Sequence, residues 1–122
     1  FVMQVIDLNS KFNLFKDFWA PKIVAELNDH QFKIAKIKGE FVFHKHDDTD
    51  EAFIVIKGEM FMKLESNTVC VREGEMCVVK KNITHKPFAP EECWIMLVEM
   101  AGTKNTGDAE EFSMPSTEGV EI

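Results

Sequence analysis

The stretch His44-Lys45-His46-Asp47-Asp48-Thr49-Asp50-Glu51 decides the fold, because it joins two β-like runs through an acidic turn. Residues 40–46 end on two histidines that are two positions apart, and residues 51–56 open on a glutamate. Side chains at positions i and i+2 of a strand point to the same face, so the two imidazoles are expected to lie side by side.

Short apolar runs separated by turn residues extend outward from this stretch. The candidate strands are residues 31–38, 40–46, 51–56, 59–65, 68–72, 76–80, 84–89 and 92–100. Strands this short at this spacing predict an all-β sandwich or barrel. Residues 7–30 are expected to be irregular apart from a helical turn around Lys11–Lys16. The polar tail after Gly102 is expected to wrap the surface or to be partly disordered.

Length and composition limit what surrounds the strands. The chain has 122 residues, of which 45% are hydrophobic, and a formal charge of −7. This predicts a single domain over residues 1–122, with a barrel core at about 30–100, an N-terminal arm at 1–29 and a tail at 101–122. The acidic balance argues against nucleic acid or an anionic membrane as a partner, because both favour a basic face.

The compartment is expected to be the cytoplasm. The longest apolar run, residues 93–98, is too short to span a bilayer, and the N-terminus has no signal-peptide pattern. The three cysteines form no CxxC motif and sit in apolar runs, which fits reduced thiols in a reducing compartment.

A two-residue turn at Lys57-Gly58 is expected to fold residues 51–56 back on residues 59–65. The facing pairs would be Val55 with Met60, Phe53 with Met62 and Glu51 with Leu64. Residues that face each other share one side of the sheet, here the side of the two histidines. The side chains expected to line a small-molecule pocket are therefore Phe53, Val55, Met60, Met62 and Leu64.

The opposite side of the same strands is predicted to be apolar as well. Its expected members are Phe41, Phe43, Ile54, Ile56 and Phe61, and exposing all five would be costly. The N-terminal residues Phe12, Phe15, Phe18 and Trp19 could cover them, or a second subunit could. A two-fold homodimer is favoured.

His85 completes a set of three histidines and one carboxylate. A lone His-x-His pair, a lone glutamate or a lone histidine has an ordinary structural explanation, but their joint spacing favours metal ligation by His44, His46, Glu51 and His85. This donor set suits a divalent transition metal such as Fe, Mn, Ni, Cu or Zn, and it leaves coordination positions open for a ligand. No further catalytic residue is identified.

The spacing of these residues resembles the cupin superfamily, in particular small cupin-2-type proteins that are often labelled similar to mannose-6-phosphate isomerase. The first cupin motif reads Gly39, His44, His46, Glu51 and Gly58, with Gly39 one residue closer than usual. The second retains Gly74 and His85 but has Lys80, Asn82 and Ala89 where the family has Pro, Gly and Asn. Over about residues 30–100, the resemblance implies a double-stranded β-helix (jelly roll) with a metal inside the barrel, commonly in a dimer.

Three functions remain open from the sequence. One is a metal-dependent enzyme on a small oxygenated molecule, of the oxygenase, isomerase, epimerase or lyase type. Another is a non-catalytic module that binds or senses a small molecule through the metal. The third is a structural barrel with an empty site, against which the complete ligand set argues. The fold alone does not decide among them.

Overall fold

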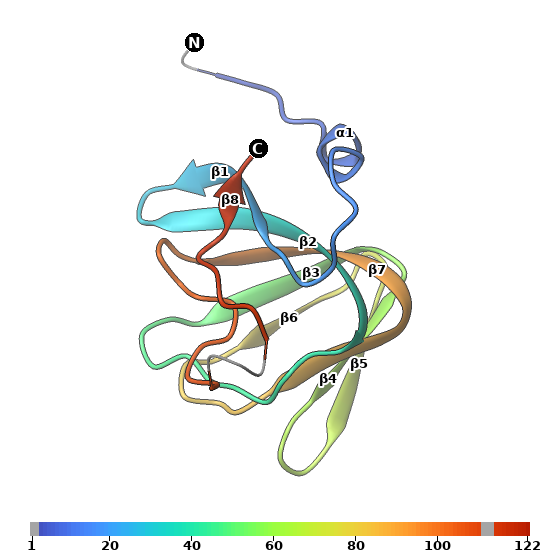
Figure 1. Ribbon diagram of the computed structural model, residues 1–122, viewed down its shortest axis with the longest axis vertical. Helices are drawn as coiled ribbons and strands as arrows, with labels where there is room; N and C mark the ends of the chain where they lie inside the picture. The colour runs from blue at the N-terminus through green and yellow to red at the C-terminus, as the bar shows by residue number, and fades with distance from the viewer. Residues whose placement is uncertain (1–2, 111–113) are drawn as a thin grey trace.

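The computed structural model describes residues 3–110 and 114–122 (Figure 1). Its elements are α1 (Leu8–Phe12), β1 (Lys22–Leu27), β2 (His30–Glu40), β3 (Glu51–Lys57), β4 (Glu59–Lys63), β5 (Thr68–Arg72), β6 (Met76–Val79), β7 (Lys86–Met100) and β8 (Val120–Glu121). The predicted all-β fold is confirmed, and most of the predicted strands lie within a few residues of their expected bounds.

The long strand β7 holds the sheet together. Its first residues pair with β4, and its C-terminal half lies between β2 and β3. The strand order is β5-β4-β7-β2-β1-β8, and β3 adds β6 as an edge strand. Because β7 bends while it changes partners, the strands curl around a buried apolar cluster. Figure 1 shows the curved course of β7.

The two strands predicted at 84–89 and 92–100 form one strand, so the predicted break at Pro90 is wrong. The sheet keeps β7 continuous by a bulge: Ile37 faces Cys93 and Gly39 faces Ala89, which leaves residues 90–92 opposite Lys38. Pro90 has no N–H to donate to a neighbouring strand, and a bulge is where a strand accepts such a residue.

The predicted hairpin between residues 51–56 and 59–65 is also wrong. β3 pairs with β6 and β7, whereas β4 pairs with β5 and β7. Gly58 (φ 91°) carries the chain from one set of partners to the other, and a Cβ there would lie 3.0 Å from the Glu92 carbonyl oxygen. The alternation was nevertheless predicted correctly, because the inward residues Phe53, Val55, Met60 and Met62 are all buried in the core.

Residues 41–46 do not continue as the predicted strand. β2 ends at Glu40, and the segment then makes one isolated bridge, between His44 and His85. Phe41 donates its N–H to the Pro87 carbonyl, but Pro87 has no N–H to return, so a regular ladder cannot form here.

Two segments are more ordered than the sequence pattern predicted. Residues 22–27, expected to be irregular, form β1 and turn into β2 at Asn28, whose φ of 55° is a left-handed value that asparagine tolerates well. The tail returns to pair β8 in parallel with β1. The helical turn lies slightly earlier than expected, because Asp7 caps α1 by accepting a hydrogen bond from the Ser10 N–H at 3.1 Å.

The N-terminal segment covers part of the predicted outer apolar face. Phe12 stacks on Trp94 at 4.6 Å, and Ile56 packs against the same cluster. Phe43 remains 44% exposed. Phe41 was predicted on this face, but it is buried on the opposite side, because the chain bends between Gly39 and His44.

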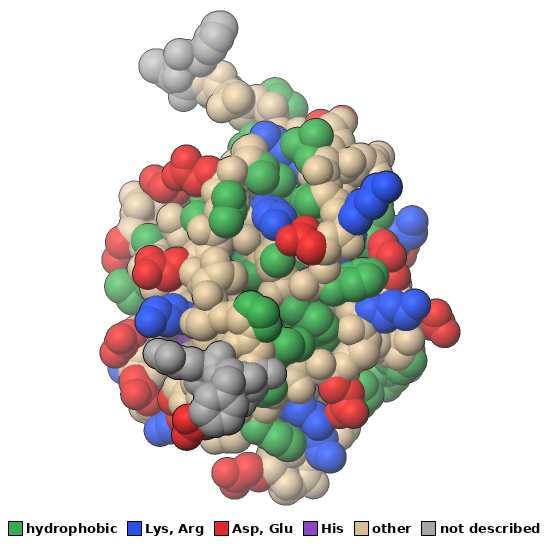
Figure 2. Space-filling view, viewed as in Figure 1, with side chains coloured by type: hydrophobic (Ala, Val, Ile, Leu, Met, Phe, Trp, Pro, Cys, Tyr) green, Lys and Arg blue, Asp and Glu red, His purple; other side chains and the backbone are tan. Residues whose placement is uncertain are grey.

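Figure 2 shows acidic and basic side chains interspersed over the face it presents, with apolar side chains between them. The described part of the chain contains no helix with the length and hydropathy needed to cross a membrane.

Candidate metal centre

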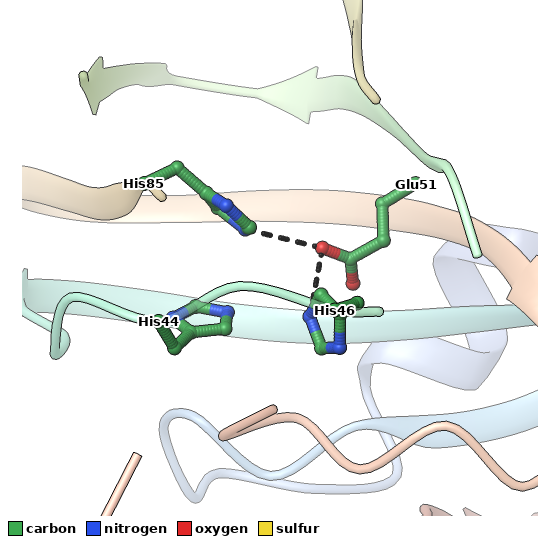
Figure 3. Close-up of side chains that lie close together, drawn as sticks. All are labelled: His44, His46, Glu51 and His85. Atoms are coloured by element: carbon green, nitrogen blue, oxygen red, sulfur yellow. Dashed lines mark hydrogen bonds and ion pairs between the residues drawn. The ribbon is translucent and has the colours of Figure 1, made fainter. Parts of the chain in front are cut away.

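Four buried side chains from separate segments meet inside the barrel (Figure 3). His44 and His46 lie in the loop after β2, Glu51 opens β3, and His85 immediately precedes β7. One ligand atom from each lies within 4.8 Å of the others. The backbone fixes this arrangement, because His44 and His85 exchange N–H···O bonds of 3.0 and 2.9 Å, and the Asn82 N–H donates to the His46 carbonyl at 2.8 Å.

Backbone carbonyls determine which ring nitrogen faces the centre. His44 Nδ1 lies 2.9 Å from the Val42 carbonyl oxygen, and His85 Nδ1 lies 2.8 Å from that of Ile83. A carbonyl only accepts, so both Nδ1 atoms carry the hydrogen and both Nε2 atoms have a free lone pair. Metal-binding histidines are oriented by this kind of contact.

Two ring nitrogens approach one carboxylate oxygen. His85 Nε2 lies 3.2 Å from Glu51 Oε1, within hydrogen-bond distance, and His46 Nε2 lies 3.1 Å from the same oxygen without a hydrogen bond of acceptable geometry. A cation between these atoms would be bound by the ring nitrogens and the carboxylate oxygen together. The atoms present therefore fit a metal ion held by three nitrogens and one oxygen.

The ionisation states also suit a ligand role. Burial, reinforced by neighbouring His85, lowers the pKa of His44 to about 4 from its usual 6.5. Burial opposes ionisation of Glu51, but the close contacts of its carboxyl group with Glu99, His46 and His85 outweigh burial and hold the pKa of Glu51 well below its usual value. Metal binding requires a neutral imidazole and an ionised carboxylate, and His44 and Glu51 are in these forms at neutral pH.

The lowered pKa of His44 predicts a pH-dependent stability in the metal-free protein. Between pH 6.5 and about 4 the unfolded chain protonates His44 before the folded chain does, so the free energy of unfolding falls as the pH falls through that window. Relative to His44→Gln, wild type should lose about 3 kcal/mol over this range, measured by urea unfolding. Parallel stability curves for the two proteins would contradict the assignment.

A second buried charged group borders the centre. Lys33 Nζ lies 2.7 Å from Glu99 Oε2 and donates to the Thr103 carbonyl at 3.0 Å. Burial, together with the neighbouring Glu51 carboxylate, raises the pKa of Glu99, although Lys33 opposes this shift. Glu99 Oε1 has no hydrogen-bond partner. This pair was not predicted from the sequence, although Glu99 interrupts the apolar end of β7.

A mostly apolar cavity of about 40 Å³ adjoins His44 and Glu51. Of the five residues predicted to line the pocket, Phe53 lines this cavity. Val55, Met60 and Met62 are buried in the core, and Leu64 packs against it. The remaining lining residues are Trp19, Pro21, Ala35, Ile37, Phe41, Pro87, Ile95, Leu97, Glu99 and Asn105. These residues were not predicted, because the pocket was placed between β3 and β4, and these two strands do not pair.

Gly107 lies close against the ring of His44. It has a φ of 53°, and a Cβ there would collide with the Lys45 carbonyl oxygen and lie 3.1 Å from His44 Cδ2. Replacing Gly107 by alanine should weaken metal affinity about tenfold by displacing the imidazole, as calorimetric titration would measure. Gly102→Ala is the matched control, because Gly102 also has a positive φ but has room for a Cβ. Equal affinities in the two variants would contradict this role.

Three buried histidines and one buried carboxylate lie inside an all-β barrel, grouped closely enough to hold a metal ion. The chain belongs to the cupin domain family, whose model matches residues 32–98. The predicted resemblance and the predicted cupin fold are thereby confirmed.

The comparisons with solved structures point to the same family. A cupin-2 domain-containing protein from Shewanella frigidimarina is 48% identical, with a TM-score of 0.78 over 79% of this chain and 94% of that one. Protein NMB1881 from Neisseria meningitidis is 28% identical, with a TM-score of 0.74 over 80% of this chain and 99% of that one.

The uncharacterized protein YdbB of Bacillus subtilis is 31% identical over 64 residues. That match covers 52% of this chain and 57% of that protein, so the chain spans little more than half of the length of this relative.

Proposed function

We propose that His44, His46, Glu51 and His85 bind one divalent transition-metal ion, and that the ion acts on a small oxygenated molecule in the adjoining cavity. The observation that carries this proposal is the close approach of the His46 and His85 Nε2 atoms to Glu51 Oε1, at 3.1 and 3.2 Å, in the buried interior. A cation in this position would be held by the ring nitrogens and by the charge of the carboxylate, away from solvent.

A bound ion of this kind supplies Lewis acidity toward a ligand oxygen and, for a redox-active metal, one-electron chemistry. The chain's own residues do the rest. Apolar walls such as Phe53 and Leu97 exclude water, and Glu99 places a hydrogen-bonding oxygen in the cavity. The reaction class fits an oxygenase, isomerase, epimerase or lyase, and the metal is one of Fe, Mn, Ni, Cu and Zn.

The second candidate is a non-catalytic module that binds or senses its ligand through the metal. One observation favours it. Among the described residues that line the cavity, the titratable side chain other than the proposed ligands is Glu99, and its carboxyl group is already paired with Lys33. A general acid or base needs freedom to exchange its proton with the ligand.

Dioxygen uptake and ligand-dependent melting separate the two candidates. Wild type loaded with iron, manganese or nickel would be offered catechols, diketones and thiols, with Glu51→Gln as the inactive control. Turnover or dioxygen consumption in wild type, lost in Glu51→Gln, supports the enzyme. A melting shift without turnover for any metal would establish the binding module. If the protein shows neither turnover nor a melting shift, both candidates are contradicted.

We further propose a single-domain cytoplasmic homodimer. Three free cysteines fit a reducing compartment. The edge strand β6 exposes Met76 and Val78 by 57% and 50%, apolar surface that a second subunit would cover. Sedimentation equilibrium at micromolar concentration should give twice the 14.0 kDa chain mass, and a 14.0 kDa species would exclude the dimer.

A further inference from the structure

We infer that Trp19 is a specificity-determining residue that limits the size of the molecule able to reach the metal centre. This inference rests on the proposed metal binding. Two hollows lie on either side of Trp19. The inner cavity beside His44 and Glu51 measures about 40 Å³, and an outer groove between residues 17–22 and 114–120 measures about 430 Å³. The two share Trp19, Pro21 and Phe41 as a common wall.

The indole forms this wall as part of a row of rings. Trp19 stacks on Phe41 with a centroid distance of 4.8 Å and an interplanar angle of 22°. Phe41 in turn meets His44 edge-on at 5.3 Å. The rings therefore run from the outer groove to a proposed metal ligand, and a molecule that passes between the two hollows has to contact or displace them.

Hydrogen bonds hold Trp19 in a conformation that it would not adopt by itself. Its φ is 59°, a left-handed value that is a clear outlier for a bulky aromatic residue. Trp19 N–H donates to the Lys36 carbonyl and Nε1–H to the Lys38 carbonyl, each at 2.9 Å. Asn105 Nδ2 donates to the Trp19 carbonyl at 3.3 Å. Strain held in this way is typical of residues that clamp or select a ligand.

The inner cavity has room for only a very small molecule. A volume of about 40 Å³ corresponds to about three water molecules, which is the size of a formate ion rather than of an aromatic acid. The outer groove is about ten times larger by the same measure. Trp19 thus divides space that a larger ligand could otherwise use as one pocket.

The test compares formate with benzoate, which share a carboxylate but differ in size. Each is titrated into the cobalt-loaded protein, and binding is followed by the visible absorption of cobalt. Trp19→Gly removes the indole and suits the positive φ, so it should strengthen benzoate binding at least about tenfold and change formate binding less than about twofold. Trp19→Phe keeps an aromatic wall and should behave like wild type. Phe18→Ala is the matched control, because Phe18 lines the outer groove but not the inner cavity.

The outcomes separate this inference from the metal proposal. An unchanged ratio of formate to benzoate affinity in Trp19→Gly, with cobalt bound in every variant, would overturn the role of Trp19 alone. An equal gain in benzoate affinity in Phe18→Ala would also overturn the role of Trp19. Wild type that shows no cobalt absorption band would overturn the metal proposal, and the size limit at the metal centre with it.

Discussion

Replacing His85 by glutamine is expected to abolish the stabilisation of this protein by divalent metal ions. A metal ion at one hundred times its dissociation constant raises the free energy of unfolding by about 2.7 kcal/mol, provided that it binds only the folded state. His85 is buried, and its Nε2 faces Glu51 Oε1 at 3.2 Å. Glutamine keeps most of the side-chain volume but does not restore the imidazole nitrogen, so the metal-dependent melting shift should disappear. Glu51→Gln should have the same effect.

His30→Gln is the control for both substitutions. His30 lies outside the group, its side chain is 44% exposed, and its Nδ1 contacts Asp29 Oδ1 at 2.8 Å. This variant should retain the full metal-dependent shift in thermal unfolding. If His85→Gln and Glu51→Gln kept the wild-type shift, the metal would have to bind elsewhere.

Glu99→Leu is expected to destabilise the metal-free protein by about 3–5 kcal/mol, because it leaves a buried lysine without its partner. Lys33 is 1% exposed, and its ammonium group lies 2.7 Å from Glu99 Oε2. The double variant Lys33→Met/Glu99→Leu removes both polar groups and should recover most of the loss, since an apolar pair of similar size can replace a buried ion pair.

Urea unfolding of wild type, the two single variants and the double variant gives the coupling energy between Lys33 and Glu99. A double variant whose loss equals the sum of the single losses would show that the two side chains act independently. That result would contradict the buried ion pair.

The candidate site could be predicted from the sequence to a greater extent than the way the strands pair. The joint spacing of His44, His46 and Glu51, together with the place of His85 in the second cupin motif, predicted that these four residues share one location. That the metal is bound stays a prediction. The partner of β3 was predicted wrongly, since pairing between distant strands depends on the whole sheet and not on the nearest turn.

The cavity lining and the neighbouring ion pair depend on contacts between distant segments. Trp19 reaches the cavity because its backbone pairs with Lys36, and Phe41 turns inward because β2 ends at Glu40. Lys33 and Glu99 meet only when β2 and β7 lie side by side. No local pattern in the sequence encodes these contacts, so they appear only in the folded chain.

Metal content per chain tests the central proposal most directly. Wild-type protein purified without chelators would be analysed by mass spectrometry of its elements beside the His46→Ala/His85→Ala double variant. We expect close to one divalent transition-metal ion per wild-type chain and close to none in the variant. A wild-type protein that carries no such metal, and that takes up neither Fe, Mn, Ni, Cu nor Zn when each is supplied, would contradict metal binding at this centre.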